Sequence, residues 1–307
     1  MESIKPKVSI VIPHYNQVEY LKRLLPGVAN QTFQDSEVII IDDFTPDRSV
    51  PAQVRELIKG YPRMRLVENT ENVGFVRTCN KGIELARGDY VCLLNQDTEV
   101  RDNFVQRNAE IMDADLSIGA LSCIIVDREG KNWFTGGMFE KGLTVNLQDD
   151  FQGIRTVDWI AGTAPFYRRE VFYKIGLFDE NFFMYHEDVE FGLRMKAKTA
   201  YKACMFDERL VVHHVVPSLQ TNEKSFYGHR NHILILRMYF PKYLLKVVLN
   251  FYAREIANLL LNAVLKFDVK HISSSLYITK GIIQGLVMRK SSCECTMQTA
   301  VPTVDRG

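Results

Sequence analysis

The chain has 307 residues, of which 46% are apolar, and 38 basic side chains nearly balance 37 acidic ones to leave a formal net charge of +1. A chain of this length and composition can bury a large core, either as one α/β domain with an appendage or as two ordinary domains. The balanced charge supplies no bulk attraction for DNA or RNA, which argues against a nucleic-acid-binding protein.

The opening residues, MESIKPKVSIVIP, contain no basic stretch followed by a long apolar run, so they do not have the pattern of a secretory signal. Their apolar part is too short to cross a bilayer. We therefore expect a cytoplasmic protein.

Short runs of β-branched and apolar residues predict strands at Val8–Ile12, Glu37–Ile41, Met64–Glu68 and Tyr90–Leu94. Helical patterns between them predict helices at Val18–Ala29, Val54–Lys59 and Phe75–Ala86. Because the strands lack strict polar alternation and helices separate them, we expect a mainly parallel sheet covered by helices on both faces.

Ligands of such α/β sheets bind beyond the carboxyl ends of the strands. This rule points to the loops Pro13–Asn16, Asp42–Asp47 and Asn95–Thr98. From about Gly119 to Arg168, shorter strands and glycine turns predict a mixed or antiparallel extension of the sheet.

A helix with Glu187 and Asp188 near its start is predicted to run to about Lys198, and a strand follows at Leu210–His214. Beyond Asn222 the pattern is mainly helical. One long helix is predicted from polar residues that recur at every fourth position, at Lys246, Asn250, Arg254, Asn258, Asn262 and Lys266.

A second apolar helix is predicted at Leu276–Met288, and the polar tail 291–307 is expected to be disordered. Charges at Arg254 and Glu255 argue against a membrane-spanning helix. Two alternatives stay open for these C-terminal helices. They form a hairpin that packs on the catalytic domain or on a second subunit, or they rest with flanking basic residues on an anionic membrane surface.

Acidic groups follow two of the predicted strands, in the sequences IIIDD (Ile39–Asp43) and LLNQD (Leu93–Asp97). Carboxylates placed at a cleft can accept hydrogen bonds from a base or a sugar, or bind a hard divalent cation. Asp and Asn also favour turns and helix caps. Either loop alone leaves the choice open, whereas the two together favour a binding site.

Glu187 and Asp188 follow His186 at the predicted helix start, where a carboxylate can be merely a cap. Nearby Phe182 and Tyr185 would desolvate a carboxylate and raise its proton affinity, which suits a general base acting on a sugar hydroxyl. The pair His213-His214 ends an apolar strand and is either structural or, beside Asp97, a source of one cation ligand.

The ordered series VSIVIPHYNQVEYLKRLL, QTF, EVIIIDDFTPD and ENVGFVRTCNKGIELARGDYVCLLNQDTEV resembles the opening of family 2 glycosyltransferases with the GT-A fold. The later series WIAGTAPFYRREVFYKIGLFDENFFMYHEDVEFGLRMK, VVHH, VPS and HRN is similar to the bacterial branch of rhamnosyltransferases and galactofuranosyltransferases. The resemblance covers roughly residues 5–240. It implies a GT-A catalytic domain at 1–240 and a helical extension at 241–290.

The resemblance also implies roles for residues of this chain. Nucleotide-binding roles fall on Pro13, Tyr15, Asp42, Asp43, Asn72, Gly74, Asn80 and Asn95. Asp97 would bind Mg²⁺ or Mn²⁺ at the diphosphate, with His213 approaching the same ion. An acceptor-side loop would contain Trp159, Gly162 and Thr163.

In the family's E-D pair, Glu187 precedes the catalytic base Asp188, and Arg230-Asn231 matches an R-N pair. Two positions depart from the family pattern. Asn95-Gln96-Asp97 lacks the first carboxylate of the D-x-D motif, and Phe44 stands where relatives have a small residue.

Together these features predict an inverting glycosyltransferase. It would move a sugar, rhamnose as the first guess, from a dTDP- or UDP-linked donor to a saccharide or lipid-linked saccharide acceptor in cell-surface polysaccharide assembly. The alternative is an inactive homologue that binds the nucleotide sugar without turnover. Contact with the inner face of the membrane and an oligomeric state are further possibilities that the resemblance leaves open.

Overall fold

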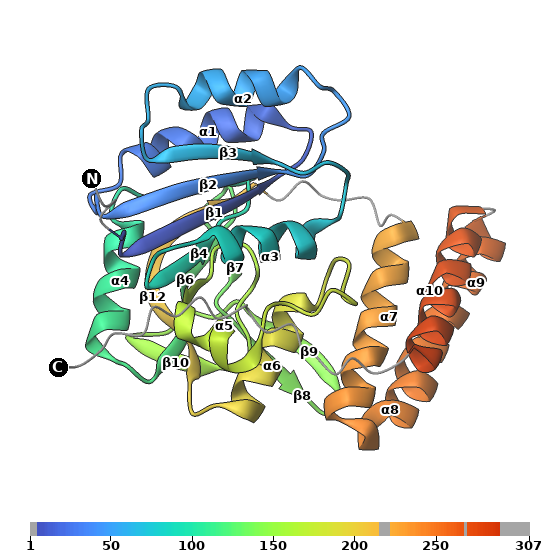
Figure 1. The fold of residues 1–307 in the computed structure, drawn as a ribbon. Coiled ribbons are helices and arrows are strands. Elements are labelled where there is room, and N and C mark those ends of the chain that lie inside the picture. The colour runs from blue at the N-terminus through green and yellow to red at the C-terminus, as the bar shows by residue number, and fades with distance from the viewer. Residues whose placement is uncertain (1–4, 215–221, 267–268, 289–307) are drawn as a thin grey trace.

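The computed structural model of the chain describes residues 5–214, 222–266 and 269–288 (Figure 1). The described strands are β1 (Val8–His14), β2 (Ser36–Asp42), β3 (Met64–Glu68), β4 (Tyr90–Leu93), β5 (Thr98–Val100), β6 (Ile118–Val126), β7 (Asn132–Phe134), β8 (Gly136–Glu140), β9 (Leu143–Leu147), β10 (Ile154–Val157), β11 (Phe166–Arg168) and β12 (Lys202–His213). The described helices are α1 (Val18–Ala29), α2 (Val50–Ile58), α3 (Phe75–Leu85), α4 (Phe104–Ala114), α5 (Arg169–Ile175), α6 (Glu187–Lys198), α7 (Asn222–Tyr239), α8 (Pro241–Val247), the π-helical turn η1 (Val248–Tyr252), α9 (Ala253–Lys266) and α10 (Val269–Val287).

A central mixed sheet has the strand order β10-β12-β6-β11-β4-β1-β2-β3, with β5 beside β12 and β7 beside β6. The run β4-β1-β2-β3 is parallel, as predicted, whereas β11 pairs antiparallel with both β4 and β6. A separate two-stranded ribbon consists of β8 and β9. The predicted α/β sheet with a mixed extension is therefore confirmed.

The direction of the chain through the sheet explains where ligands can bind. From β1 the chain moves outward to β2 and β3, and it then returns through α3 to β4 on the other side of β1. Because such crossovers are right-handed, this reversal puts α1 and α2 on one face and α3 on the opposite face. A crevice opens at the carboxyl ends of β1 and β4, where the order of the strands reverses.

Burial follows the predicted patterns. Strands β1 and β2 are buried along their whole lengths, and α1 turns Val18, Leu21, Leu24, Leu25 and Val28 to the core at helical spacing. Helix α2 begins at Val50, four residues before the predicted start, and β12 begins at Lys202 rather than Leu210. Helix α4, Phe104–Ala114, is not among the helices predicted from the sequence.

The C-terminal helices form a layer beside the sheet domain, in which α7 and α10 lie side by side (Figure 1). Their close approach depends on Gly281 and Gly285, since a Cβ at these positions would lie 2.4 Å from the Phe226 carbonyl oxygen and 2.6 Å from that of Arg230. A second apolar cluster holds the layer together; its buried members are Ile233, Leu236, Val247, Tyr252, Ile278 and Ile282.

The helix predicted around Lys246–Lys266 is present, because α8, η1 and α9 follow one another along the chain without a break. It is not regular throughout, since a π-helical turn, Val248–Tyr252, lies between α8 and α9. Tyr252 ends this turn in a buried position, where its hydroxyl hydrogen-bonds the His232 ring. Within the described ranges, every helix is too short or too polar to cross a bilayer. The predicted disordered tail lies outside the described residues.

Candidate active site

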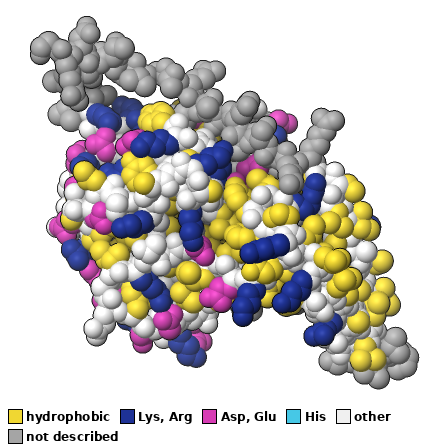
Figure 2. Space-filling model, turned by 90° about the horizontal axis from the view of Figure 1, so that it is seen from below, with side chains coloured by type: hydrophobic (Ala, Val, Ile, Leu, Met, Phe, Trp, Pro, Cys, Tyr) yellow, Lys and Arg dark blue, Asp and Glu magenta, His cyan; other side chains and the backbone are white. Residues whose placement is uncertain are grey.

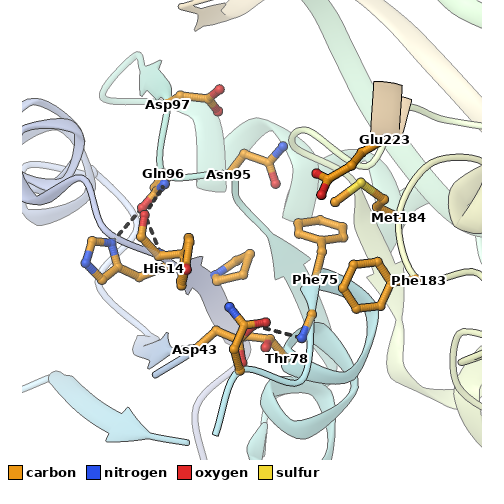
Figure 3. A pocket seen from close by; sticks show the side chains of 14 residues that line it. His14, Asp43, Phe75, Thr78, Asn95, Gln96, Asp97, Phe183, Met184 and Glu223 are labelled. Atoms are coloured by element: carbon orange, nitrogen blue, oxygen red, sulfur yellow. Dashed lines mark hydrogen bonds between the residues drawn. The ribbon is translucent and has the colours of Figure 1, made fainter. Parts of the chain in front are cut away.

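A cavity of about 510 Å³ opens at the crevice between β1 and β4 (Figure 3). Its walls come from the loops after four parallel strands, from the start of α3, and from two segments much later in the chain. The lining residues are Pro13, His14, Tyr15, Asp43, Asn72, Gly74, Phe75, Thr78, Asn95, Gln96, Asp97, Phe183, Met184 and Glu223. We call this the donor cavity, after the nucleotide-sugar donor that the sequence resemblance leads us to expect there.

Gln96, the middle residue of the Asn95-Gln96-Asp97 sequence, joins the loops after β1 and β4. Its side-chain oxygen lies 2.6 Å from Nδ1 of His14 and accepts from the Tyr15 N–H at 3.3 Å, and its Nε2 donates to the Tyr15 carbonyl at 3.2 Å. An amide oxygen can only accept, so Nδ1 of His14 carries the proton and Nε2 is an acceptor. Burial lowers the pKa of His14, which keeps the ring neutral.

Asp43 is buried at one end of the donor cavity, and Figure 3 shows Asp97 at the other. Oδ1 of Asp43 accepts from Asn69 Nδ2 at 2.8 Å and from the Val73 N–H at 2.9 Å, and Oδ2 of Asp43 accepts from the Gly74 N–H at 2.9 Å. These donors fix the carboxylate in place. Oδ2 keeps a lone pair that can accept a further N–H from a ligand.

Asp42 and Asn80, two predicted nucleotide-binding residues, do not line the cavity. Asp42 is fully buried and accepts from both the backbone N–H and the hydroxyl of Thr45. Asn80 is buried against Phe178, donating to its carbonyl at 2.9 Å and accepting from its N–H at 3.1 Å. Asp42 therefore holds its own loop, and Asn80 holds α3 against the backbone at Phe178.

Gly74 lines the cavity, and contacts within the protein are sufficient to explain why this position is a glycine. Its φ is +87°, and a Cβ would lie 2.5 Å from the ring of Phe183. The missing Cβ makes room for an aromatic ring that forms part of the cavity wall.

At the Asp97 end, His213 Nε2 lies 3.3 Å from Oδ2 of Asp97. Both ring nitrogens of the neighbouring His214 have hydrogen-bond partners, since Nε2 lies 2.6 Å from Glu99 Oε1 and Nδ1 accepts from Arg128 at 2.7 Å. Of the two histidines, therefore, His213 is the one beside Asp97.

A divalent cation fits this end of the cavity only if a substrate supplies some of its ligands. Within the described part of the chain, no three His, Cys, Asp or Glu side chains are grouped as metal ligands. The buried Oδ1 of Asn95 has no partner among the described residues and, like Asp97, faces the cavity. Mg²⁺ is commonly held by one or two carboxylates together with substrate phosphates, which suits this sparse set of ligands.

Glu187 and Asp188 begin α6 behind the donor cavity. The Asp188 carboxylate accepts from the Gly162 N–H at 2.9 Å and from the Val189 N–H at 2.8 Å. Burial raises the pKa of Asp188, against the opposing effect of these two bonds. Burial and the neighbouring Asp188 also raise the pKa of Glu187. A carboxylate with raised proton affinity is suited to general-base chemistry.

The predicted acceptor-side residues lie between this pair and the donor cavity. The Asn95 N–H donates to the Thr163 carbonyl at 2.9 Å, and Gly162, the next residue, donates to Asp188. Two hydrogen bonds, each donated by a backbone N–H, thus connect the cavity lining to the carboxylate. Trp159 is buried under β8, with its Nε1 3.5 Å from the Met138 carbonyl, and it therefore supports the loop from behind.

The turn before Asp188 is backbone-strained and is held by α7. Tyr185 and His186 both have positive φ, 65° and 67°. Asn231 donates its two amide hydrogens to the carbonyls of Met184 at 2.8 Å and Tyr185 at 2.7 Å. Arg230 donates to the Asn181 carbonyl at 2.6 Å. The R-N pair therefore fixes the turn that presents the carboxylates.

Sequence reasoning did not single out several residues that line the cavity, namely His14, Phe75, Thr78, Gln96, Phe183, Met184 and Glu223. His14 and Gln96 lie within predicted ligand loops, and Phe75 and Thr78 share one face of α3 at helical spacing. Phe183 and Glu223 reach the cavity from segments much later in the chain, and no local pattern marks them as residues of its lining.

Known proteins resemble this chain over most of its length. An uncharacterised glycosyltransferase of Haemophilus influenzae is 23% identical over 295 residues, which cover 92% of this chain and 86% of the relative. The amylovoran biosynthesis glycosyltransferase AmsB of Erwinia amylovora is 28% identical over 226 residues, which cover 71% of this chain and 72% of AmsB.

The solved structure of GalNAc-T7 with UDP, GalNAc and Mn²⁺ superposes with a TM-score of 0.65 at 17% identity, over 84% of this chain and 51% of that chain. At this identity the likeness shows the fold alone, a GT-A arrangement as predicted. The family description Glycosyl transferase family 2 matches residues 9–176, more than half of the chain. This protein therefore belongs to glycosyl transferase family 2.

Proposed function

We propose that this protein transfers a sugar from a nucleoside-diphosphate donor to a saccharide acceptor, with inversion at the anomeric carbon. The observation that carries the proposal is the continuous path from the donor cavity to Asp188. Asn95 lines the cavity and bonds Thr163, and the adjacent Gly162 bonds Asp188. A donor in the cavity and a base behind it would therefore flank one reacting centre.

The donor would lie with its base near Asp43 and its diphosphate near Asp97. The free lone pair of Asp43 can accept the ring N–H that uracil and thymine share. This preference supports a UDP- or dTDP-linked donor, and the GalNAc-T7 structure contains UDP. Rhamnose stays our first guess for the sugar. The name of AmsB supports a role in polysaccharide assembly.

In the reaction, the acceptor hydroxyl oxygen forms a bond to the anomeric carbon while the bond from that carbon to the diphosphate breaks. Asp188 accepts the hydroxyl proton, an effect typically worth about 10²–10⁴-fold in rate. Attack on the face opposite the diphosphate inverts the configuration. Asp97 and His213 would hold Mg²⁺ or Mn²⁺, which supplies charge neutralisation for the departing diphosphate.

The second candidate is a homologue that binds a nucleotide sugar without turning it over. The specific observation in its favour is Asn95, an amide where the family's metal motif has a carboxylate. Only Asp97 then contributes a negative charge from this motif.

A donor screen separates the two. Purified protein is incubated with UDP- and dTDP-linked sugars, with and without Mn²⁺, beside the Asp97→Ala variant. The matched control is Glu99→Ala, which removes a carboxylate that bonds His214 outside the cavity. The proposal predicts Mn²⁺-dependent release of nucleoside diphosphate, at least about 100-fold slower in Asp97→Ala and within threefold of wild type in the control. Binding without release from any donor would favour the inactive homologue.

The C-terminal helices lead us to propose a peripheral contact with a membrane surface, where a lipid-linked acceptor would be found. Figure 2 shows hydrophobic side chains beside Lys and Arg over these helices. The exposed hydrophobic residues of α8, η1 and α9 are Leu245, Leu249, Phe251, Leu260 and Leu261. An apolar face bordered by basic residues is typical of helices that lie on anionic bilayers.

A further inference from the structure

A second cavity, of about 520 Å³, lies behind the donor cavity and is lined mostly by residues without an assigned role. It is an open cavity bordered by β9, the turn before α6, one face of α7, and the junction of η1 with α9. Its lining residues are Leu143, Thr144, Val145, Tyr185, His186, Lys224, Ser225, Gly228, His229, His232, Phe251, Tyr252 and Glu255.

The two cavities share two walls. In the turn before α6, Phe183 and Met184 face the donor cavity, whereas Tyr185 and His186 line the second one. At the start of α7, Glu223 lines the first cavity and the next residues line the second. The shared turn leads directly into Glu187-Asp188, so the proposed base follows the wall that the two cavities share.

Gly228 is the feature that first points to a ligand. It lies inside α7 without a positive φ, and a Cβ there would meet no atom within 4 Å. Gly281 and Gly285 of α10, by contrast, are needed for close packing. Glycine weakens a helix interior relative to alanine. Neither backbone conformation nor packing among the described residues accounts for Gly228, whereas a need for open space in the cavity does.

Two buried polar atoms of the lining are the second, independent feature. Ser225 is 4% exposed, and neither its Oγ nor Nδ1 of His186 has a hydrogen-bond partner within the described part of the chain. Such atoms are costly to leave unpaired in a protein interior. Hydroxyl groups of a bound ligand would satisfy both, because they donate as well as accept.

The charge of the lining favours an uncharged ligand. His229 Nε2 lies 3.0 Å from Glu255, and His232 Nε2 lies 2.8 Å from the Gly142 carbonyl. Burial lowers the pKa of His186 and His232, so both rings are neutral near pH 7. The charged groups of the lining are therefore the Lys224 ammonium group and the Glu255 carboxylate, which faces His229. A site with this carboxylate is a poor environment for a phosphate.

Aromatic side chains complete the chemistry at the mouth of the cavity. Tyr185 is 41% exposed and Phe251 is 49% exposed, although both line the cavity. Aromatic faces pack against the C–H faces of sugar rings, while the polar groups deeper inside select hydroxyl positions. A fatty chain would leave Ser225 Oγ and His186 Nδ1 without hydrogen-bond partners, and a phosphate would be repelled by the Glu255 carboxylate.

We propose that this second cavity binds a non-reacting sugar unit of an uncharged saccharide acceptor and so holds the reacting hydroxyl at Asp188. The inference rests on the proposed function, since it names the acceptor class of that site.

The test fills the cavity from within α7. Gly228→Phe projects a ring into the open space, and Gly228→Ala is the matched control, which supports the helix and leaves most of the space free. Two affinities are measured for each protein. UDP binding with MnCl₂ is followed by calorimetry, and binding of p-nitrophenyl mono- and disaccharides is followed by saturation-transfer NMR, with circular dichroism to verify folding.

The proposal predicts that wild type binds at least one neutral glycoside, that this affinity falls at least tenfold in Gly228→Phe, and that it stays within threefold in Gly228→Ala. UDP affinity should change less than twofold in both. Phe251→Ala, at the exposed mouth, should weaken the same glycoside without filling the cavity.

The proposal is overturned if no glycoside binds, if Gly228→Phe binds as wild type does, or if excess UDP-sugar displaces the glycoside. If the wild type binds neither UDP nor dTDP, the proposed function is contradicted instead, so the two failures are distinguishable.

Discussion

The backbone N–H of Gly162 donates a hydrogen bond to Oδ2 of Asp188 at 2.9 Å, and it thereby attaches the acceptor-side loop to the proposed base. A Cβ at Gly162 would lie 3.7 Å from the same oxygen, which is ordinary van der Waals contact. The position can therefore take a methyl group without a collision. That methyl group would further exclude water from a carboxylate whose burial already raises its pKa.

The first prediction concerns the pH profile. A general base must be ionised, so kcat should fall as pH drops through the raised pKa of Asp188, at a higher pH than the value of about 3.9 for an exposed aspartate would give. Gly162→Ala should move this acidic limb to higher pH. Initial rates between pH 4.5 and 8 test it, and a flat acidic limb in both proteins would show that Asp188 does not titrate in the reaction.

The second prediction concerns stability. Glu187 is 8% exposed, and burial together with Asp188 raises its pKa. A carboxyl group that titrates higher in the folded state stabilises the fold below its unfolded pKa of about 4.3, and this contribution is lost as pH rises. Gln cannot ionise, so Glu187→Gln should raise Tm relative to wild type by at least about 2 °C at pH 8 and by less at pH 5. A Tm difference that is the same at both pH values would contradict this reasoning.

The third prediction concerns the turn that precedes α6. Asn231→Asp keeps the shape of the side chain but removes both donors to the carbonyls of Met184 and Tyr185. Both hydrogen bonds are part-buried, and an unpaired polar group in a protein interior costs about 1–3 kcal/mol, so urea denaturation should show a loss of about 2 kcal/mol for the two together. The control is Asn250→Asp at an exposed position, expected within about 0.5 kcal/mol of wild type. Equal stability of the two variants would mean that Asn231 does not hold the turn.

The sequence allowed the parallel half of the sheet to be predicted because its strands are continuous apolar runs followed by polar loops. The same rule led to Asp43, Asn95 and Asp97, which do line the donor cavity. It also led to Asp42, which is buried and accepts two hydrogen bonds from Thr45 of its own loop. Spacing cannot distinguish a carboxylate that faces a ligand from one that faces its own loop.

What could not be predicted depends on contacts between distant segments. Phe183 forms a wall of the donor cavity because Gly74 leaves room for its ring. The second cavity exists because α7 and η1 meet the turn at Tyr185. The π-helical turn also escaped prediction, since the polar repeat of every fourth residue continues through it.

The fourth prediction concerns the membrane surface. Leu245 and Leu249 are 69% and 58% exposed on α8 and η1, so glutamate at both positions should reduce flotation with anionic vesicles at least about fivefold. The matched control is Leu116→Glu, at a leucine of the sheet domain that is 71% exposed. Recovery of wild type and both variants in the soluble fraction alike would reject the membrane contact.

The most direct test of the central claim is sugar transfer by Asp188→Asn, measured beside its affinity for UDP. Asparagine can still accept from the Gly162 N–H through its side-chain oxygen, but it cannot take up a proton as a base. The account predicts that transfer falls by about 10²–10⁴-fold while UDP affinity stays within twofold, because Asp188 does not line the donor cavity. Transfer at the wild-type rate would contradict the assignment of Asp188 as the base.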